Sequence, residues 1–292
     1  MDWITGMQKA IDYIEDNITE DLDYNEIAKR AYSSSFHFQR VFSIMCGYTI
    51  GEYIRNRRLT LAEGELANSN AKVIDVALKY GYDSPDSFAK AFTRFHGITP
   101  SSAREAGANL KSFSRLSIKL SLEGGSIMDY RIEEKEAFKI IAKTERFNAE
   151  DEINKVDIPK FWDKCHADGT INELYRYAKG SKIFGQAILG ICEENTCEGA
   201  KDFPYSIGAE YCGGDVPKDF VVKAVPKFTW AIFKCTGAMP NGIQDGWHKI
   251  YTEFFPTSEY KPISLIDFEV YPDGDMSSKD YISEIWTPIE KK

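Results

Sequence analysis

The sequence predicts an N-terminal all-α domain with two helix-turn-helix units, joined to a C-terminal α+β domain built from two β-α-β-β repeats around a cleft. Residues 24–49 and 73–99 carry one pattern of Ala, Ser, Phe, Gly and Thr twice, offset by about fifty residues. Residues 128–292 pass twice through strand, helix and two strands, with a period of about 85–90 residues. Residues 107–127 change to Ser, Lys and alternating apolar residues, as expected of a linker with one short strand. The predicted domains are therefore residues 1–106 and 128–292.

The composition is typical of a globular protein without a membrane-spanning part. The chain has 292 residues, enough for about two domains, with 43% hydrophobic and 28% charged residues. No apolar run approaches the roughly 20 residues that a membrane helix needs, and the start, MDWITGMQKAIDYIED, is too acidic for a signal peptide. We expect no membrane partner and a cytoplasmic location. The net charge of −9 argues against non-specific coating of nucleic acid.

Cysteine and histidine indicate neither a disulfide framework nor a zinc site. The sequence has four histidines and no Cys-x-x-Cys pair. The six cysteines are Cys46, Cys165, Cys192, Cys197, Cys212 and Cys235. We expect buried, reduced thiols, and no metal or cofactor.

Each copy of the first repeat begins with a short helix, expected at 24–31 and 73–80. An Ala on the inner face of each helix lets a second helix approach closely. A turn rich in Ser and Asp follows, where Ser34 or Ser84 can cap the next helix by accepting a free N–H.

The second helix of each copy is expected at 35–46 and 85–96. Each carries two Phe four residues apart, which places both rings on one buried face, and each is followed by a Gly suited to the left-handed C-cap. Each copy is thus a helix-turn-helix. Residues 50–67 form a linking helix of roughly 27 Å, near the about 34 Å repeat of B-DNA. The alternative is an ordinary helical bundle, which also shows Phe pairs at this spacing.

The stretches SSSFHFQRVFSIMCGYT, RNRRL, VIDVALKYGYDSPDSFAKAF and GITPSSAR follow one another in this region. In this order they resemble the AraC/XylS family of transcription regulators, over about residues 3–106. The resemblance implies binding to double-stranded operator DNA, with the two second helices in successive major-groove segments. The groove-facing residues implied for the first recognition helix are Ser35, Phe36, His37, Gln39 and Arg40.

The chemistry of these side chains suits the implied role. Arg40 can bond a guanine edge through two donors, Gln39 an adenine edge, and Phe36 can touch a thymine methyl, each good pair giving about 1–3 kcal/mol of discrimination. Three arginines of the linking helix are interpreted as phosphate contacts, with a solvated helix face as the alternative. They are Arg55, Arg57 and Arg58.

The second recognition helix is less suited to reading bases. Its expected exposed residues are Pro85, Asp86, Ser87 and Lys90. We therefore predict that the first helix supplies most of the sequence discrimination and that the second mainly anchors. Residues 1–106 contain 12 Lys and Arg against 15 Asp and Glu, which implies modest non-specific affinity for DNA.

Each repeat of the second half starts with two alternating segments, followed by an amphipathic helix at about 151–166 or 241–255. Trp162 and Trp247 occupy matching positions on these helices. Two strands close each repeat, KIFGQAILGICEE with FPYSIGAEYCG and SLIDFEVYP with DYISEIWTP. A β-α-β-β unit leaves one sheet face bare, so two units around a pseudo-twofold axis leave a cleft. In the linker, LSIKLSL predicts the short strand.

The stretch GGSIMDYRIEEK, the strand FPYSIGA and the closing strand EIWTPI resemble the GyrI-like small-molecule-binding domain, over about residues 117–290. The resemblance implies that the central acidic residue is Glu284, with Ile282 and Trp286 on the same strand face. Gly208 would take about the corresponding place in the first repeat and leave room for a ligand.

A carboxylate among aromatic rings favours an organic cation, which offers both charge pairing and a stacking surface. We predict a lipophilic cation or an amphipathic aromatic as the effector. The predicted ligand-binding residues are Glu284, Trp286, Trp230, Tyr211 and Phe184. The alternative for these aromatic residues is an ordinary place in the core.

The function predicted from these observations is that of a one-component transcription regulator without enzymatic activity, with RNA polymerase as a further candidate partner. One alternative is a GyrI-like hydrolase or drug-sequestering domain fused to a DNA anchor, in which Glu284 acts as a base beside Tyr211. Another is a module that binds and inhibits a protein.

Overall fold

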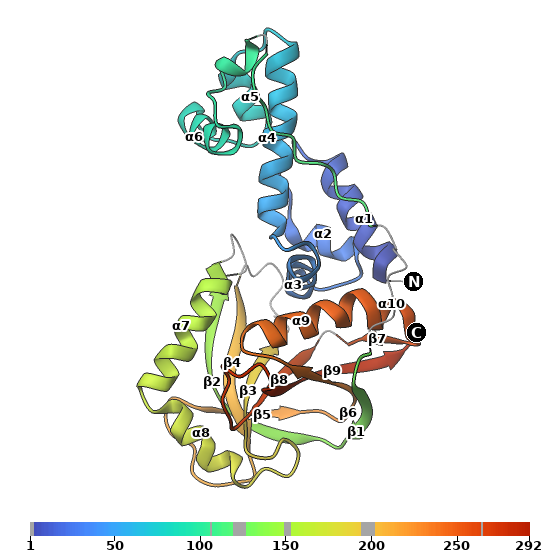
Figure 1. Cartoon of the computed structure of the whole chain (residues 1–292), viewed down its shortest axis with the longest axis vertical. Coiled ribbons are helices and arrows are strands. Elements are labelled where there is room, and N and C mark those ends of the chain that lie inside the picture. Colours follow the sequence, from blue (N-terminus) through green and yellow to red (C-terminus); the bar gives the residue numbers. More distant parts are fainter. Residues whose placement is uncertain (1–2, 106, 119–126, 149–152, 194–201, 264) are drawn as a thin grey trace. The chain divides into compact units, whose positions relative to one another are not determined.

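The computed structural model describes the chain except for residues 1–2, 106, 119–126, 149–152, 194–201 and 264 (Figure 1). The chain divides into two compact units. The first comprises residues 1–35 and 48–121, and the second comprises residues 36–47 and 122–292. The second unit thus includes nearly all of helix α3 (Ser35–Cys46), which the sequence assigns to the N-terminal domain.

The first unit is built from helices, as the sequence predicts. They are α1 (Trp3–Asp16), α2 (Tyr24–Arg30), α4 (Ile50–Asn68), α5 (Val73–Lys79), α6 (Pro85–His96) and the short 3-10 helix η1 (Ser102–Arg104). The bounds of α2, α4, α5 and α6 differ from the predicted ones by one residue at most. An apolar cluster joins α4, α5 and α6 through Leu66, Ala77, Phe88 and Phe92.

Local capping explains where α6 begins and ends. The Ser87 N–H donates to Ser84 Oγ at 3.2 Å, and Pro85 stands in the first turn, where its missing N–H leaves no bond unmade. Gly97 ends the helix with a φ of 84°, the left-handed conformation that Gly adopts without strain. Both predicted signals are confirmed.

Residues 107–118 lie along α1 and α4. The Leu116 N–H donates to the Tyr53 hydroxyl at 3.1 Å, and the Ile118 N–H donates to Gln8 Oε1 at 2.8 Å. The short strand predicted for LSIKLSL is not formed at 116–118, and the rest of that stretch lies outside the described residues.

The second unit repeats the order of two strands, a helical segment and two strands. The first repeat contains β1 (Tyr130–Lys135), β2 (Phe138–Asn148), α7 (Ile153–Ala167), α8 (Thr170–Ala178), β3 (Ala187–Glu193) and β4 (Asp202–Glu210). The second contains β5 (Val221–Val225), β6 (Phe228–Thr236), α9 (Asn241–Lys249), η3 (Ile250–Phe254), α10 (Phe255–Thr257), β7 (Tyr260–Pro262), β8 (Ile266–Pro272) and β9 (Ile282–Lys291). Helix α8 and strand β7 were not predicted. In the described part of the chain, no helix is both long and apolar enough to cross a membrane.

The strands of this unit form an antiparallel sheet in the order β1-β6-β9-β8-β3-β4-β2-β5, with β7 beside β9. The two repeats exchange their first strands, because β1 pairs with β6 and β2 pairs with β5. Strands β3 and β8 meet at the centre, where Gly190 pairs with Glu269 midway along the register. This pair marks the pseudo-twofold axis between the repeats.

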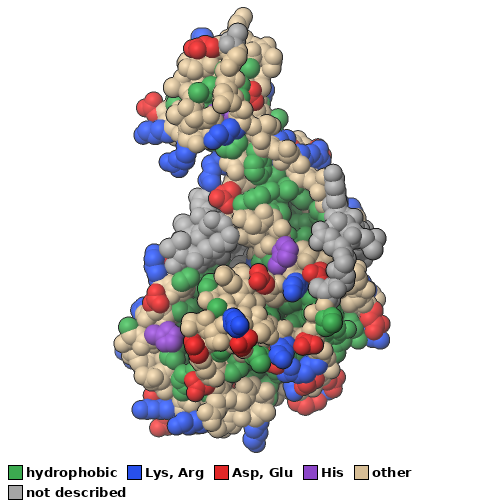
Figure 2. Space-filling model, viewed as in Figure 1, with side chains coloured by type: hydrophobic (Ala, Val, Ile, Leu, Met, Phe, Trp, Pro, Cys, Tyr) green, Lys and Arg blue, Asp and Glu red, His purple; other side chains and the backbone are tan. Residues whose placement is uncertain are grey.

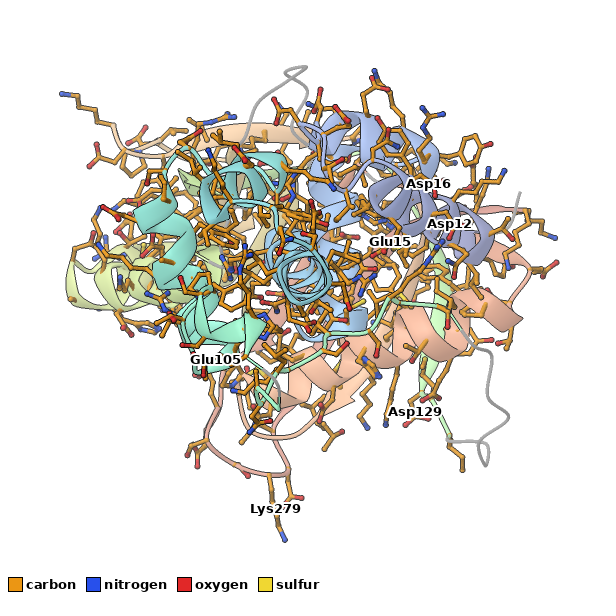
Figure 3. All side chains as sticks on the ribbon, turned by 90° about the horizontal axis from the view of Figure 1, so that it is seen from above. Asp12, Glu15, Asp16, Glu105, Asp129 and Lys279 are labelled. Atoms are coloured by element: carbon orange, nitrogen blue, oxygen red, sulfur yellow. The ribbon has the colours of Figure 1, made fainter. Side chains whose placement is uncertain are left out.

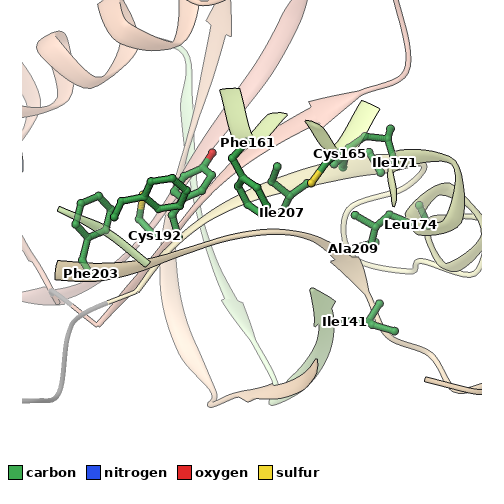
Figure 4. Close-up of a cluster of buried hydrophobic side chains, with 13 residues drawn as sticks. Ile141, Phe161, Cys165, Ile171, Leu174, Cys192, Phe203, Ile207 and Ala209 are labelled. Carbon is green, nitrogen blue, oxygen red and sulfur yellow. The ribbon is translucent and has the colours of Figure 1, made fainter. Parts of the chain in front are cut away.

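The two faces of the sheet bury different clusters. Helices α7 and α8 cover β2, β3 and β4 and bury a cluster that includes Phe161, Cys165 and Ile207 (Figure 4). Helix α9 packs on β6 and β9 on the same face. The opposite face carries a cluster rich in aromatic rings that includes Trp230 and Trp286.

Candidate functional site

Two carboxylates are buried on the central strand β8. Acidic and basic side chains are interspersed on the visible surface of this unit (Figure 2), whereas Asp267 and Glu269 are only 8% and 9% exposed. Because side chains alternate along a strand, both point to the face covered by helices, while Phe268 and Val270 join the aromatic cluster on the other face. A buried carboxylate is unfavourable unless it is paired or hydrogen-bonded, so its partners define the site.

The Glu269 carboxylate is held by two aromatic donors. Trp247 Nε1 of α9 donates to Oε1 at 2.8 Å, and the Tyr271 hydroxyl donates to Oε2 at 2.9 Å. These two bonds fix the orientation of the carboxylate and leave its remaining lone pairs for a cation.

The space around Glu269 depends on Gly190. A Cβ atom at this position would lie 2.5 Å from the Tyr205 hydroxyl oxygen and 3.2 Å from Glu269 Oε2. On the α7 side, Trp162 Nε1 donates to the Tyr205 hydroxyl at 3.0 Å, and the Trp162 ring meets Tyr271 edge-on, with the centroids 5.4 Å apart. We call the set Trp162, Tyr205, Trp247, Asp267, Glu269 and Tyr271 the acidic cage.

Arg40 of α3 contacts the acidic cage. Its Nη1 donates to Asp267 Oδ2 at 2.9 Å, and its Nη2 lies 3.7 Å from Glu269 Oε1. Its Cζ lies 4.1 Å from the centroid of the Trp247 ring, within the range of a cation–π contact. The Arg40 side chain is 13% exposed. Burial raises the pKa of Asp267, although the positive charge of Arg40 acts to lower it.

Two further contacts join α3 to the helical segment that begins with α9. The His37 ring packs against Tyr251 with the centroids 5.9 Å apart, and His248 Nδ1 lies 3.3 Å from the Ile44 carbonyl oxygen. Burial and the neighbouring Arg40 charge lower the pKa of His37 to about 3, so the imidazole is neutral at physiological pH.

Two α3 residues that were predicted to contact DNA therefore contact the second unit in the structure. His37 and Arg40 pack against the C-terminal sheet domain, whereas the sequence places them on an outward face. Ser35 begins the helix and Gln39 is partly buried, and the side chain of Phe36 lies outside the described residues.

Arg57 has a different role from the predicted phosphate contact. Its Nε and Nη2 donate to the two carboxylate oxygens of Glu15 on α1, at 2.8 and 2.9 Å, and its Nη1 donates to the Phe113 carbonyl at 2.6 Å. The Arg57 side chain is 11% exposed. Figure 3 shows Glu15 on α1 near the acidic Asp12 and Asp16. Arg57 thus ties α1 and the segment 107–118 to α4.

The other two arginines of α4 differ from each other. Arg58 donates to the carbonyl oxygens of Ile18 and Glu20 at 2.8 and 2.7 Å, so it also serves to hold the unit together. Arg55 is 44% exposed and lies 3.9 Å from Glu52, and it stays a candidate for a phosphate contact. The four residues predicted for α6, namely Pro85, Asp86, Ser87 and Lys90, are all exposed.

The predicted ligand residue Glu284 belongs to a different environment from the acidic cage. Its carboxylate accepts two bonds from the Arg131 guanidinium, at 2.6 and 3.1 Å, and one from Trp286 Nε1 at 2.8 Å. Trp286 packs with Trp230 and Phe184 in the aromatic cluster, with all three side chains buried. The structure brings these four predicted residues together, with Glu284 in an ion pair with Arg131 beside the buried aromatic cluster.

Tyr211 and Gly208 do not join that group. Tyr211 packs beside the cluster under α7 and α8, and its hydroxyl donates to the Gly214 carbonyl at 2.5 Å. The space at Gly208 is filled, since a Cβ there would lie 2.6 Å from the Ile141 carbonyl oxygen. Gly208 pairs with Leu189 on β3 as Trp286 pairs with Phe268 on β8, so Gly208 corresponds to Trp286 and not to Glu284.

The sequence contained one signal for the acidic cage. In SLIDFEVYP, two acids alternate with Phe and Val, and the structure places this strand at the centre of the sheet. The matching positions of Trp162 and Trp247 indicate that both indoles face the same axis.

The profiles of two known families match the chain. The GyrI-like small molecule binding domain matches residues 128–290, and a helix-turn-helix domain matches residues 27–106. The regulatory protein SoxS of Salmonella typhimurium is 37% identical over 98 residues, which are 34% of this chain and 92% of SoxS. The chain belongs to the AraC and GyrI-like families. Both resemblances stated from the sequence are thereby confirmed.

Other relatives of this AraC-family chain match one of its halves. The transcriptional activator AarP of Providencia stuartii is 47% identical over 89 residues, which are 30% of this chain and 66% of AarP. A solved structure of SAV2435 bound to tetraphenylphosphonium is 23% identical, covers 56% of this chain and 94% of its own, and has a TM-score of 0.49. The DNA-binding domain of AdpA in complex with a target DNA is 26% identical, covers 34% of this chain and 89% of its own, and has a TM-score of 0.32.

Proposed function

We propose that this AraC-family chain is a one-component transcription regulator that binds operator DNA and senses a lipophilic organic cation in the acidic cage. The observation that carries the ligand class is the pair of buried carboxylates, Asp267 and Glu269, beside the face of the Trp247 indole. This arrangement already holds one organic cation, the guanidinium of Arg40, by charge pairing and stacking. Glu269 replaces Glu284 as the centre of the proposed site.

The chemistry of the acidic cage selects for charge and for apolar surface at once. Two carboxylates removed from water attract a cation far more strongly than they would in solvent, and they repel an anion. The indole and phenol rings offer stacking surface to an aromatic or quaternary cation. Because Trp247 and Tyr271 already fix the Glu269 carboxylate, this carboxylate need not change its orientation to receive a cation.

We propose that the acidic cage binds its ligand without converting it. Both Glu269 oxygens accept a hydrogen bond from a fixed donor, so Trp247 and Tyr271 already hold the carboxylate in one orientation. Burial raises the pKa of the neighbouring Cys192 thiol to about 12, so it is not a nucleophile near neutral pH. The mass of a ligand recovered after incubation should be unchanged, whereas a hydrolysed product would favour the hydrolase alternative.

The DNA-binding role rests on the helical half. We propose that α3 and α6 are the two recognition helices, that Arg55 contacts phosphate, and that the regulator acts in the cytoplasm with RNA polymerase as a partner. The similarity to AarP, a transcriptional activator, supports RNA polymerase as a partner.

Titration of the full chain with tetraphenylphosphonium tests the ligand proposal. This probe carries a permanent, delocalised charge, and its binding can be followed by calorimetry. Glu269→Gln should weaken binding by about 2–5 kcal/mol, because it removes one partner of a buried charge pair. Glu290→Gln, at an exposed carboxylate paired with Lys261, is the matched control and should bind as the wild type does.

Two results would count against the proposed ligand site. One is equal affinity of the wild type and Glu269→Gln for the probe, with both proteins shown to be folded by circular dichroism. The other is equally tight binding of the neutral triphenylphosphine oxide, which would show that charge does not contribute.

A further inference from the structure

Arg40 is the side chain to which the sequence and the structure give different partners. The sequence assigns its two donors to a guanine edge, and the structure gives its Nη1 to Asp267 at 2.9 Å and its π face to Trp247. One guanidinium cannot do both at once. The residue best suited to read DNA is therefore also the residue that fills the proposed ligand site.

We propose that Arg40 is an internal cation that closes the acidic cage, so that a cationic effector displaces it and thereby frees α3 to bind DNA. This inference rests on the proposed function, because it concerns regulation at the same site. It predicts that effector and DNA strengthen each other's binding.

The first observation in support of this competition is that Arg40 makes the contacts that an external cationic ligand would make. It supplies the positive charge for Asp267 at 2.9 Å and for Glu269 at 3.7 Å, and it stacks on the Trp247 ring at 4.1 Å. An effector cation needs the same carboxylates and the same indole face. The two cations therefore compete for one set of partners.

The second support is the penalty for leaving the site empty. If Arg40 withdraws with nothing in its place, two buried carboxylates lose their counter-charge, which is strongly unfavourable. An effector cation removes this penalty by replacing the charge. The effector thus favours the state in which α3 is released, as differential affinity for two states requires.

The third support is that further contacts hold α3 in the same position. The neutral His37 ring packs on Tyr251, and His248 Nδ1 lies 3.3 Å from the Ile44 carbonyl oxygen. Release of Arg40 is therefore coupled to the placement of the whole helix and not to one side chain.

The coupling must be reciprocal. If the effector raises the affinity for DNA by some factor, DNA must raise the affinity for the effector by the same factor, which is typically about 5–150-fold in allosteric proteins. The same reasoning predicts that weakening the hold on Arg40 imitates the effector.

The first experiment measures tetraphenylphosphonium binding by the full chain without DNA. Arg40→Ala removes the internal competitor, so the probe should bind at least five-fold tighter than to the wild type. Arg176→Ala is the control, since Arg176 of α8 is 74% exposed and pairs with Glu173 on its own helix. Unchanged or weaker probe binding by Arg40→Ala would overturn the proposal.

The second experiment measures binding to a DNA duplex selected by the full chain from a random pool, at fixed salt. Tetraphenylphosphonium should raise the affinity of the wild type at least five-fold. Asp267→Asn should raise the affinity for DNA in the absence of the probe. The substitution weakens the ion pair with Arg40 and leaves the sequence of α3 unaltered. If neither the probe nor Asp267→Asn strengthens DNA binding, Arg40 is not the internal competitor that we propose.

The two proposals fail in different ways. If the probe binds through Glu269 but Arg40→Ala does not alter its affinity, the ligand site stands and the internal cation is wrong. If Glu269→Gln leaves probe binding unaffected, the ligand site itself is wrong. Thermal unfolding of each variant shows whether a loss of binding reflects loss of the fold.

Discussion

Gly190 of β3 and Glu269 of β8 pair at the pseudo-twofold axis. Because Gly190 has no side chain, the Glu269 carboxylate occupies the space beside it. A Cβ at Gly190 would lie 3.2 Å from Glu269 Oε2 and 2.5 Å from the Tyr205 hydroxyl oxygen. The duplication of the domain thus places a carboxylate in only one of two equivalent positions. The acidic cage is asymmetric as a result, with Glu269 bonded to Trp247 and Tyr205 bonded to Trp162.

Gly190→Ala should therefore disturb both the fold and the site. Tyr205 is 2% exposed and accepts a bond from Trp162, so its hydroxyl cannot easily move away from the new methyl group. We expect a loss of about 1–3 kcal/mol in the free energy of unfolding, as in other overpacked cores. Urea unfolding measures this, and Tyr205→Phe in the same chain should recover part of the loss. A Gly190→Ala protein as stable as the wild type would show that the space is larger than described.

Arg57→Ala tests whether this arginine holds the helical unit together. The Arg57 and Glu15 side chains are 11% and 7% exposed, so the substitution leaves a buried carboxylate without its counter-charge, with the Tyr53 hydroxyl as its remaining donor. We expect a loss of about 3–5 kcal/mol in the free energy of unfolding. Arg55→Ala, at an exposed position on the same helix, should change stability by less than about 0.5 kcal/mol. Similar small losses for both variants would favour the phosphate contact predicted from the sequence.

His37 makes the stability of the second unit sensitive to pH. Its pKa is lowered from 6.5 to about 3 in the folded chain, so its contribution to stability is present above pH 6.5 and is lost as the pH falls toward 3. Below pH 6.5 we expect a loss of up to about 1.4 kcal/mol per pH unit from this group. Arg40 and Tyr251 face the His37 ring. Asp267 has a raised pKa, so its contribution to the pH dependence of stability has the opposite sign and comes at lower pH.

The difference between the wild type and His37→Asn isolates the histidine term. Denaturant unfolding between pH 7.5 and 5.5 should show a steeper loss of stability in the wild type than in the variant. Parallel curves for the two proteins would mean that His37 is exposed and titrates normally.

Arg40 and Lys90 should differ in their effects on DNA binding. On a selected duplex and its single base-pair variants, Arg40→Ala should remove about 1–3 kcal/mol of discrimination at one position. Lys90→Ala should weaken binding to all duplexes alike and reduce the salt slope by about one. Equal losses of specificity in both variants would contradict the ranking of the two recognition helices.

The helices of the first half could be predicted closely because their signals are local. Ser84, Gly97 and the Phe pair of α6 act within a few residues, so their pattern fixes where the helix begins, ends and buries its face. The contacts of Arg57 could not be predicted from such local signals. Its partners, Glu15 and the Phe113 carbonyl, lie about 40 and 56 residues away along the chain, and no local pattern connects them.

The choice between Glu284 and Glu269 depended on facts that the sequence does not contain. Both acids alternate with large apolar residues on neighbouring strands, and both have an indole nearby. Which acid enters the site depends on which sheet face α7 and α9 cover. The sheet register also matches Gly208 to Trp286, two residues away from the predicted match, Glu284.

A crystal structure of the full chain with tetraphenylphosphonium would show which carboxylate the cation contacts. We expect the cation against the Trp247 indole and the Glu269 carboxylate, with the Arg40 guanidinium withdrawn from Asp267. Density for the cation at the Glu284–Arg131 pair, with Arg40 still bonded to Asp267, would contradict it.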